Sequence, residues 1–409
     1  MDFTTLSPPP YLSNIVGYLK DNESELWQWF EQHQLDPERM NSARLQLLKT
    51  TYRIEKDVHP RLYQLAAGIA AKFEIDQPLT FYQAQESNQL NAALSFIPGE
   101  AHVIFFGPLL DNFTDAELEV IVGHELCHFL MWTQNQQDFF IAEQVLNALA
   151  NDPQAEICHS ESARLFSLFT EVYCDRGALK VTQDLYTTIS TLLRVGTGLK
   201  EINAQSFLKQ SEEILQQENK GSDSLSHPES YLRARALQLW HEHPEDVEGS
   251  IEILIRGPHS LQKLDLLGRQ YLENLTREFL QCFLLPQWFR TDTVLTHARL
   301  FFDPLFLDDP QATTKTISET DLCQRLQSAD EKQQEYYCYL MLDFVAADRE
   351  LEELPLAQAI QWSQKIGVDK RFAELAQKEL KLTKSRFAAI RKQTAQLLDA
   401  AAADKECHK

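Results

Sequence analysis

The pentad His124-Glu125-Leu126-Cys127-His128 combines the residue types that zinc-dependent hydrolysis requires. Residues four positions apart on an α-helix fall only about 40° apart around its axis, so both imidazoles can bind one metal ion. Glu125 falls roughly 100° from His124, which makes it a poor third ligand. It remains close enough to accept a proton from a water molecule that the metal activates. The pentad therefore predicts a metal centre with a general base beside it.

A pair of carboxylates farther along the chain can complete this centre. Glu171 and Asp175 are four residues apart in a largely apolar stretch, so both side chains lie on one face of a predicted helix. One carboxylate can bind the metal, and the other can hold a ligand imidazole in the correct tautomer. Two alternatives remain: a pair of core histidines with a glutamate at their edge, and a solvated acidic face. The apolar neighbours disfavour the solvated face: Leu165, Phe166, Phe169, Val172, Ala178 and Leu179.

A third segment, from Ser226 to Arg233, begins a predicted helix with Pro228 in its first turn. His227 lies just before this helix and can donate a hydrogen bond to a developing oxyanion. Arg233 can pair with a carboxylate beneath the site. Standing alone, this segment would more often be the exposed start of an ordinary helix.

The pentad needs a rigid element to position it, and the sequence predicts a helix from Leu118 to Trp132. A capping box, Thr114-Asp115-Ala116-Glu117, precedes it and places the pentad about two to three turns inside the helix. Before this helix, another is predicted over 62–73, and two more helical segments over 18–32 and 43–54.

Three strand-like runs separate these helices from the pentad: 79–83, 92–97 and 102–106. We expect the last run to be an edge strand of a small three-stranded sheet. Val103 and Phe105 would then lie beside an extended substrate, which adds to the sheet as a further strand.

These motifs, in this order, resemble the HtpX-like and CAAX prenyl endopeptidase group of gluzincin metallopeptidases. The resemblance runs from about His59 to Leu239, and includes Asn91-Ala92 and the strand-glycine segment from Val103 to Leu110. It implies one zinc ion per chain, bound by three side chains: His124, His128 and Glu171. It also implies four further roles: Glu125 as general base, His227 as support for the substrate, Asp175 as partner of a ligand, and Arg233 as support for the site.

Cys127 and Cys174 depart from the pattern of this group, which usually has glycine or alanine at both positions. Small residues there suggest that two helices approach closely, so the thiols can be neighbours. They can simply fill space as small apolar groups. Alternatively, they form a thiol pair whose oxidation would shift the helices and switch off the zinc site.

Composition predicts a soluble chain, although the best-known members of the resembled group are integral membrane proteins. The 409 residues contain no window of about 20 uninterrupted apolar residues, and the amino terminus lacks the basic and apolar regions of a signal peptide. Seven scattered cysteines favour a reducing compartment, which we take to be the cytosol. The net charge of −22 disfavours nucleic acid or an anionic membrane as a partner.

The predicted fold is α+β and predominantly helical, with three regions. Residues 1–57 form a helical segment packed on a zincin-like metallopeptidase domain over 58–247, and residues 248–409 form an all-helical domain. Within the second region, the polar segment 197–226 is either a mobile lid or an ordinary surface helix and loop. Two prolines punctuate the third region: Pro304 and Pro310.

Residues 336–369 resemble part of a TerB-type helical domain, through two helices joined by an acidic turn. That resemblance implies a cation-sensing cluster of four side chains: Asp343, Asp348, Glu350 and Glu353. A solvated acidic helix start, stabilised by the helix dipole, is the alternative.

Together, these observations predict a zinc-dependent endopeptidase that hydrolyses peptide bonds of protein substrates. Three alternatives are a latent enzyme, an inactive scaffold that binds proteins through its helical C-terminal domain, and a metal hydrolase acting on a non-peptide bond. The presence of Glu125 disfavours the inactive scaffold, because a site that has lost its activity no longer requires a general base.

Overall fold

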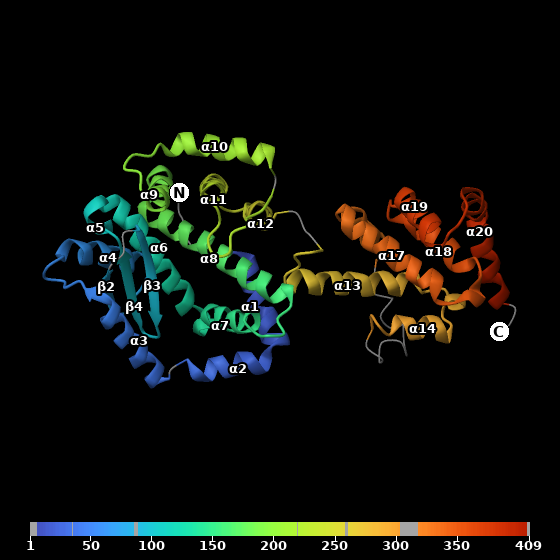
Figure 1. The fold of residues 1–409 in the computed structure, drawn as a ribbon, viewed down its shortest axis with the longest axis horizontal. Coiled ribbons are helices and arrows are strands. Elements are labelled where there is room, and N and C mark those ends of the chain that lie inside the picture. The colour runs from blue at the N-terminus through green and yellow to red at the C-terminus, as the bar shows by residue number, and fades with distance from the viewer. Residues whose placement is uncertain are drawn as a thin grey trace. The chain divides into compact units, whose positions relative to one another are not determined.

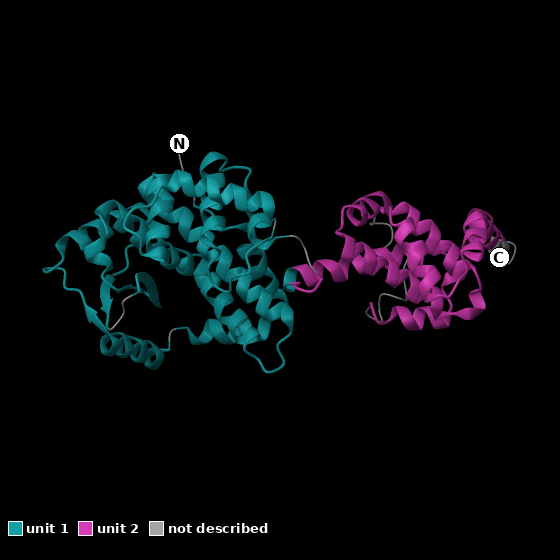
Figure 2. Cartoon of the chain, turned by 45° about the horizontal axis from the view of Figure 1, so that its top comes forward, with its two compact units in different colours: residues 1–258, 265–267 teal, residues 259–264, 268–409 magenta. Residues whose placement is uncertain are grey.

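The computed structural model describes residues 6–34, 36–85, 89–218, 220–257, 261–302 and 318–406. The chain divides into two compact units, shown in Figure 2. Unit 1 comprises residues 1–258 and 265–267, and unit 2 comprises residues 259–264 and 268–409. The first five residues, Pro304 and Pro310 lie outside the described residues, and so do the expectations based on them.

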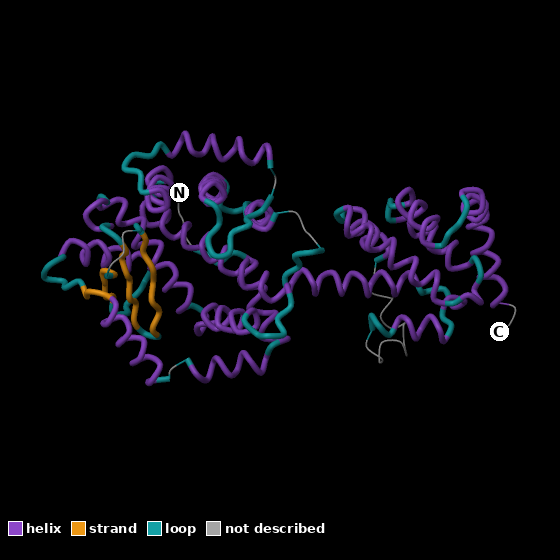
Figure 3. The backbone as a smooth tube through the Cα atoms, viewed as in Figure 1, coloured by secondary structure: helices purple, strands orange, loops and turns teal. Residues whose placement is uncertain are grey.

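Most of unit 1 is helical, as Figures 1 and 3 show. Its described helices are α1 (Pro10–Asn22), α2 (Ser24–His33), α3 (Pro37–Thr50), α4 (Pro60–Lys72), α5 (Leu109–Asn112), α6 (Asp115–Thr133), α7 (Asp138–Ala150), α8 (Ile157–Thr182), α9 (Leu185–Thr197), α10 (Ala204–Gln217), α11 (Ser230–Glu242) and α12 (Glu248–Arg256). The segment expected over 18–32 is divided at Glu23, and α11 begins two residues after Pro228. Among the described residues, no helix is both long and apolar enough to cross a membrane.

The sheet of unit 1 has four strands, one more than expected: β1 (Thr51–Arg53), β2 (Leu79–Ala84), β3 (Asn91–Ile97) and β4 (Glu100–Phe106). Their order is β1-β2-β4-β3. β2 and β4 are parallel, and the other two pairs are antiparallel. Side chains from one face join the main core, and α6 packs against β3 and β4. On the opposite face, Leu47 of α3 packs with Tyr82 and Ile97 in a smaller cluster.

The expectation that 102–106 forms the edge strand is wrong. β4 pairs with β2 on one side and with β3 on the other, so Val103 and Phe105 are fully buried in an inner strand. Val103 and Phe105 face the main core and Ile104 packs against the smaller cluster on the other face, which explains the nearly continuous apolar run in β4. Among the described residues, β3 pairs with β4 alone, so β3 is an edge strand, as is β1 at the other end of the sheet.

α6 and α8 form the centre of unit 1. The backbone N–H and the hydroxyl group of Thr114 both donate to the Glu117 carboxylate at 2.9 Å. These hydrogen bonds cap α6 at the start that the sequence predicted. Small residues let α6 and α8 approach closely. A side chain on Gly177 would place its Cβ 2.8 Å from the Cβ of Cys127, and one on Gly123 would contact Val181 at 3.3 Å.

The N-terminal segment is part of unit 1. The side chains of Tyr11, Leu12 and Ile15 from α1 are buried in its core, where α1 packs against α7 and α8. The polar segment over 197–226 includes α10, which packs against α9 and α11. Arg164 donates to the carbonyl oxygens of both Ser222 and Ser224 at 3.0 Å. These contacts favour the surface helix and loop over the mobile lid.

The described elements of unit 2 are all helical. They are α13 (Leu266–Phe283), whose first two residues belong to unit 1, α14 (Asp292–Ala298), α16 (Glu319–Gln327), α17 (Glu331–Ala347), α18 (Leu354–Lys365), α19 (Asp369–Glu379) and α20 (Lys384–Glu406), with short 3₁₀ turns. A second core lies among them, around Phe279, Phe283 and Trp362.

The acidic turn expected to bind a cation has protein partners. Asp348 accepts hydrogen bonds from the Thr291 hydroxyl at 2.6 Å and from the backbone N–H of Glu350 at 3.0 Å. Glu353 pairs with Arg386. These contacts favour a structural role for the acidic turn over the binding of a cation.

Candidate metal centre

Two imidazoles from α6 and one carboxylate from α8 meet in unit 1. Glu171 Oε2 lies 3.3 Å from His124 Nε2, and Glu171 Oε1 lies 3.4 Å from His128 Nε2. The side chains of His124 and Glu171 are less than a tenth exposed. The helix period of α6 puts both rings on the side that faces α8, so the carboxylate lies between them.

A chain of contacts reaches His124 from its Nδ1 side, opposite Glu171. Its Nδ1 lies 3.1 Å from Asp175 Oδ1, and Asp175 is one helical turn beyond Glu171 on α8. Arg233 from α11 donates to both oxygens of Asp175, through Nη2 at 2.6 Å and Nε at 2.8 Å. Asp175 can therefore hold the Nδ1 proton of the ring and leave Nε2 free to act as a ligand.

The electrostatics of this cluster favour a cation. Burial alone would lower the pKa of His124, but the adjacent carboxylates of Asp175 and Glu171 outweigh burial and raise that pKa to about 10. Burial opposes ionisation of Glu171, yet His124 and His128 hold the pKa of Glu171 well below its usual range. Burial likewise opposes ionisation of Asp175, and Arg233 lowers the pKa of that carboxyl.

The donor set fits a zinc ion. Ligand atoms of a tetrahedral zinc site, with bonds of about 2.0–2.3 Å, lie about 3.3–3.8 Å apart. The distances from Glu171 to His124 and His128 are at the lower end of this range. Glu171 Oε2 and His128 Nδ1 are buried without a hydrogen-bond partner among the described residues. Two acids, Glu171 and Asp175, adjoin one arginine, Arg233, so a divalent cation would offset their excess negative charge.

A thiol also lies within reach of the imidazoles. Potential ligand atoms of His124, His128 and Cys174 all lie within 4.8 Å of one another. Burial raises the pKa of the Cys174 thiol well above its ordinary value, and contact with Cys127 adds to this effect. Cys127 and Cys174 are therefore neighbours, as the sequence allowed, and both are free cysteines.

Two further predicted residues complete the surroundings of the centre. His227, in the loop before α11, has its Nε2 3.5 Å from Glu171 Oε1, and its side chain is 60% exposed. Its Nδ1 lies 2.9 Å from the Ser226 hydroxyl. Glu125, which follows His124 and precedes His128 in the sequence of α6, is buried. One exposed imidazole thus adjoins the carboxylate that lies between the two imidazoles of α6.

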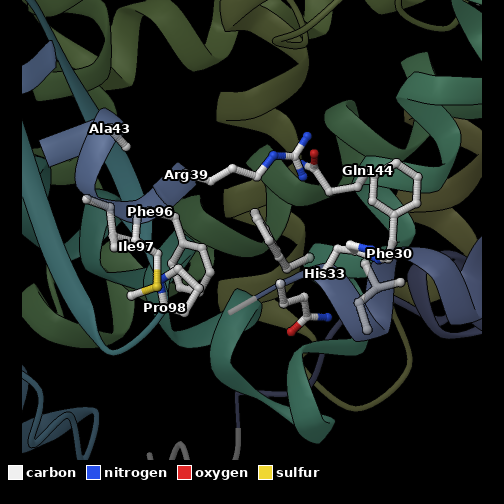
Figure 4. Close-up of a pocket in the computed structure, with 12 residues that line it drawn as sticks. Phe30, His33, Arg39, Ala43, Phe96, Ile97, Pro98 and Gln144 are labelled. Atoms are coloured by element: carbon white, nitrogen blue, oxygen red, sulfur yellow. The ribbon is translucent and has the colours of Figure 1, made fainter. Parts of the chain in front are cut away.

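An aromatic cluster borders the centre next to His128. The Trp132 ring lies 5.5 Å from the His128 ring, and Phe96 of the edge strand lies 5.6 Å from Trp132. Phe96 and Phe140 also line a mainly apolar cavity of about 170 Å³, between α2, α3, α7 and the end of β3 (Figure 4). The centre therefore has an apolar flank next to His128.

The structure brings together six predicted residues from three segments of the sequence: His124, His128, Glu171, Asp175, His227 and Arg233. Val103 and Phe105 are not among them, because they lie in the inner strand. Sequence reasoning missed the proximity of Cys174 to the imidazoles, although the three-residue spacing from Glu171 is a signal for it. It also missed Glu143 of α7, whose pKa burial raises to about 7 near His128 and Glu171.

Comparisons with known proteins relate part of unit 1 to an enzyme family. Residues 55–241, a little under half of the chain, match the family model described as peptidase family M48. One similar protein is the plastoglobule-localized metallopeptidase 48, chloroplastic, of Arabidopsis thaliana, with 24% identity over 214 residues. The match covers 48% of this chain and 61% of the plant protein, which is less than two thirds of its length. No solved structure matches the chain.

The matched segment contains the metal-centre residues from α6, α8 and α11. Residues 55–241 are thus similar to the metallopeptidases of peptidase family M48.

Proposed function

We propose that this protein is a zinc-dependent metalloendopeptidase with its active site in unit 1. The observation that carries the proposal is the carboxylate of Glu171 between the two imidazoles of α6. We assign the zinc ligands as His124, His128 and Glu171, with one ion per chain. This set of two histidines and one glutamate leaves a fourth position for water or substrate.

Zinc, when bound there, acts as a Lewis acid toward water and the scissile carbonyl group. Glu125, next to His124 on α6, accepts the proton of the attacking water and returns it to the leaving amine. Asp175 and Arg233 hold the His124 ring in its tautomer. His227, exposed beside Glu171, donates a hydrogen bond to the oxyanion that develops on the substrate.

The substrate binds as an extended peptide along β3. The edge of β3 that faces away from β4 has no strand partner among the described residues, so its N–H and C=O groups can pair with a peptide backbone. Asn91-Ala92 begins this strand, and Phe96 near its end adjoins the aromatic cluster. This arrangement replaces the role that the sequence suggested for β4.

The finer parts of the assignment stay predictions. These are the HtpX-like and CAAX prenyl endopeptidase relationship and the TerB-like character of residues 336–369. A cytosolic location also stays a prediction, since the plant relative is named as localized to plastoglobules.

The first test compares the wild type with Glu125→Gln in one reducing buffer. Zinc content and hydrolysis of a casein-type substrate are measured on the same preparations. We expect one zinc ion per chain in both proteins, and a loss of activity of about 10²–10⁴-fold in the variant, because general base catalysis contributes that much. Zinc in both without activity in either would favour the scaffold, and absence of zinc from the wild type would contradict the ligand assignment.

A further inference from the structure

One thiol belongs to the surroundings of the metal centre. Cys174 follows Glu171 by three residues on α8, so the two side chains lie about 60° apart around the helix axis. Its side chain is fully buried. Its sulfur, one ring nitrogen of His124 and one of His128 all lie within 4.8 Å of one another.

These separations approach those of a zinc site that includes sulfur. Bonds of about 2.0–2.1 Å to nitrogen and about 2.3 Å to sulfur place the ligand atoms about 3.4–3.6 Å apart. Each sulfur–nitrogen separation exceeds these values by at most about 1.4 Å. Rotation about the Cα–Cβ bond of Cys174 displaces the sulfur by that order.

The neighbouring thiol of Cys127 is directed elsewhere. Its Sγ lies 3.8 Å from the carbonyl oxygen of Tyr173, toward which it donates a weak hydrogen bond, and it adjoins Gly177. Cys127 thus faces the backbone of α8, whereas Cys174 faces the imidazoles. This difference makes Cys127 a matched control for Cys174, because both are buried thiols at the same helix contact.

We propose that Cys174 binds the metal as a thiolate, together with His124, His128 and Glu171, and so closes the fourth position of the site. The proposal rests on the metallopeptidase function proposed above. When Cys174 binds, its S–H bond breaks, its proton passes to solvent, and a sulfur–metal bond forms. When the sulfur leaves, it takes a proton back and the position opens to water.

The consequence of this ligand is latency. Four protein ligands without water are the arrangement of structural zinc sites, whereas hydrolysis requires an open position. Replacing Cys174 by alanine would leave the other three ligands in place and the fourth position open. If about nine tenths of the molecules hold the closed site, the open fraction and the activity rise about tenfold in Cys174→Ala.

The test uses the zinc-loaded full-length wild type, Cys174→Ala and Cys127→Ala under reducing conditions. X-ray absorption at the zinc edge counts sulfur neighbours, and the sulfur-to-metal charge-transfer band of the cobalt-substituted proteins gives an independent readout. We expect one sulfur neighbour at about 2.3 Å in the wild type and in Cys127→Ala, and none in Cys174→Ala. Peptidase activity should rise only in Cys174→Ala.

Wild-type zinc without a sulfur neighbour overturns the proposal, whether or not the protein is active, and so does a sulfur signal that Cys127→Ala removes. If the wild type has a sulfur neighbour and is fully active, and Cys174→Ala is no more active, the proposal that Cys174 closes the fourth position is overturned. A sulfur neighbour that Cys174→Ala lacks, with neither protein active, supports the ligand and overturns the peptidase function. If Cys174→Ala does not fold, the sulfur count in the wild type and in Cys127→Ala still tests the ligand assignment.

Discussion

At the scale of residues, each ring nitrogen of His124 lies close to a carboxylate. Nε2 faces Glu171, and Nδ1 faces Asp175, which Arg233 fixes in turn. A carboxylate beside Nδ1 favours one orientation and one tautomer of the ring, so a metal ion that binds Nε2 would cost little side-chain freedom.

Asp175→Asn tests this arrangement. We expect zinc affinity to fall about 10–100-fold, because asparagine lacks the charge that favours the Nδ1 proton of His124 and pairs with Arg233. Competition with a chelator of known affinity measures the change. Glu161→Gln is the control, since Glu161 lies on the same helix and pairs with Arg164. Equal affinities in both variants would contradict a positioning role for Asp175.

The residue types of the centre could be predicted from the sequence because their spacing carries the information. His124 and His128 share a helix face through one helical turn, and the same holds for Glu171 and Asp175. No local pattern, however, says which carboxylate faces which nitrogen. The approach of Cys174 to the imidazoles depends on how α6 packs against α8, which involves residues almost 50 positions apart.

At the scale of elements, the contact between α6 and α8 sets the geometry of the metal centre. Gly177→Ala is expected to destabilise the protein by about 1–3 kcal/mol, because the new Cβ would lie 2.2 Å from Cys127 Sγ. Urea denaturation measures the loss. Gly196→Ala on α9 is the control, since nothing lies within 4 Å of its added Cβ. There, alanine should be neutral or stabilise the helix by up to about 1 kcal/mol.

The Cys127→Gly/Gly177→Ala double variant moves the side chain at this contact from α6 to α8. Gly177→Ala should cost less stability in the Cys127→Gly background than in the wild type, because the Cys127 side chain is the group in the way. An equal cost in both backgrounds would show that the cost arises elsewhere.

The start of α6 predicts a pH dependence. Burial would raise the pKa of Glu117, but hydrogen bonds from Thr114 and the pairing with Arg194 outweigh it and lower that pKa below 4.5. A carboxyl with a lower pKa in the folded state stabilises the protein at neutral pH, and this contribution is lost as the pH falls through the folded pKa.

Glu117→Gln should therefore cost about 1 kcal/mol near pH 7 and progressively less below about pH 4.5. Urea denaturation of both proteins over this range measures the difference. Glu119→Gln removes a charge from the same helix and is the control. A difference between wild type and Glu117→Gln that does not shrink in acid would contradict the proposed cause.

The positions of the strands could be predicted from the sequence, but their order could not. Alternation and apolar runs locate β2, β3 and β4 to within about two residues. Pairing depends on contacts between distant segments, which a local pattern does not encode. One signal was available: β4 carries apolar side chains on both faces, as inner strands do, whereas β3 includes the polar Asn91 and Ser95. β1 is only three residues long, which is too short for an alternation of polar and apolar residues to be recognised.

At the scale of the whole molecule, each unit has a hydrophobic core of its own, and the described residues of the metal centre all belong to unit 1. Calorimetry should therefore show two unfolding transitions, of which a chelator lowers one. A ligand at about 100 times its dissociation constant adds about 2.7 kcal/mol, so we expect a shift of about 5–10 °C. A single transition, or equal shifts of two, would contradict independent units.

The unpaired edge of β3 has a consequence for the proteins that unit 1 can receive. An edge strand recognises the N–H and C=O groups of a backbone, and in a folded protein most of those groups are already bonded within its own helices and sheets. A chain that has lost its structure, or a segment that never had one, offers them along its whole length. The choice of substrate would then follow the conformational stability of the target more than its amino-acid sequence, so a damaged protein would be cut where its intact counterpart is spared.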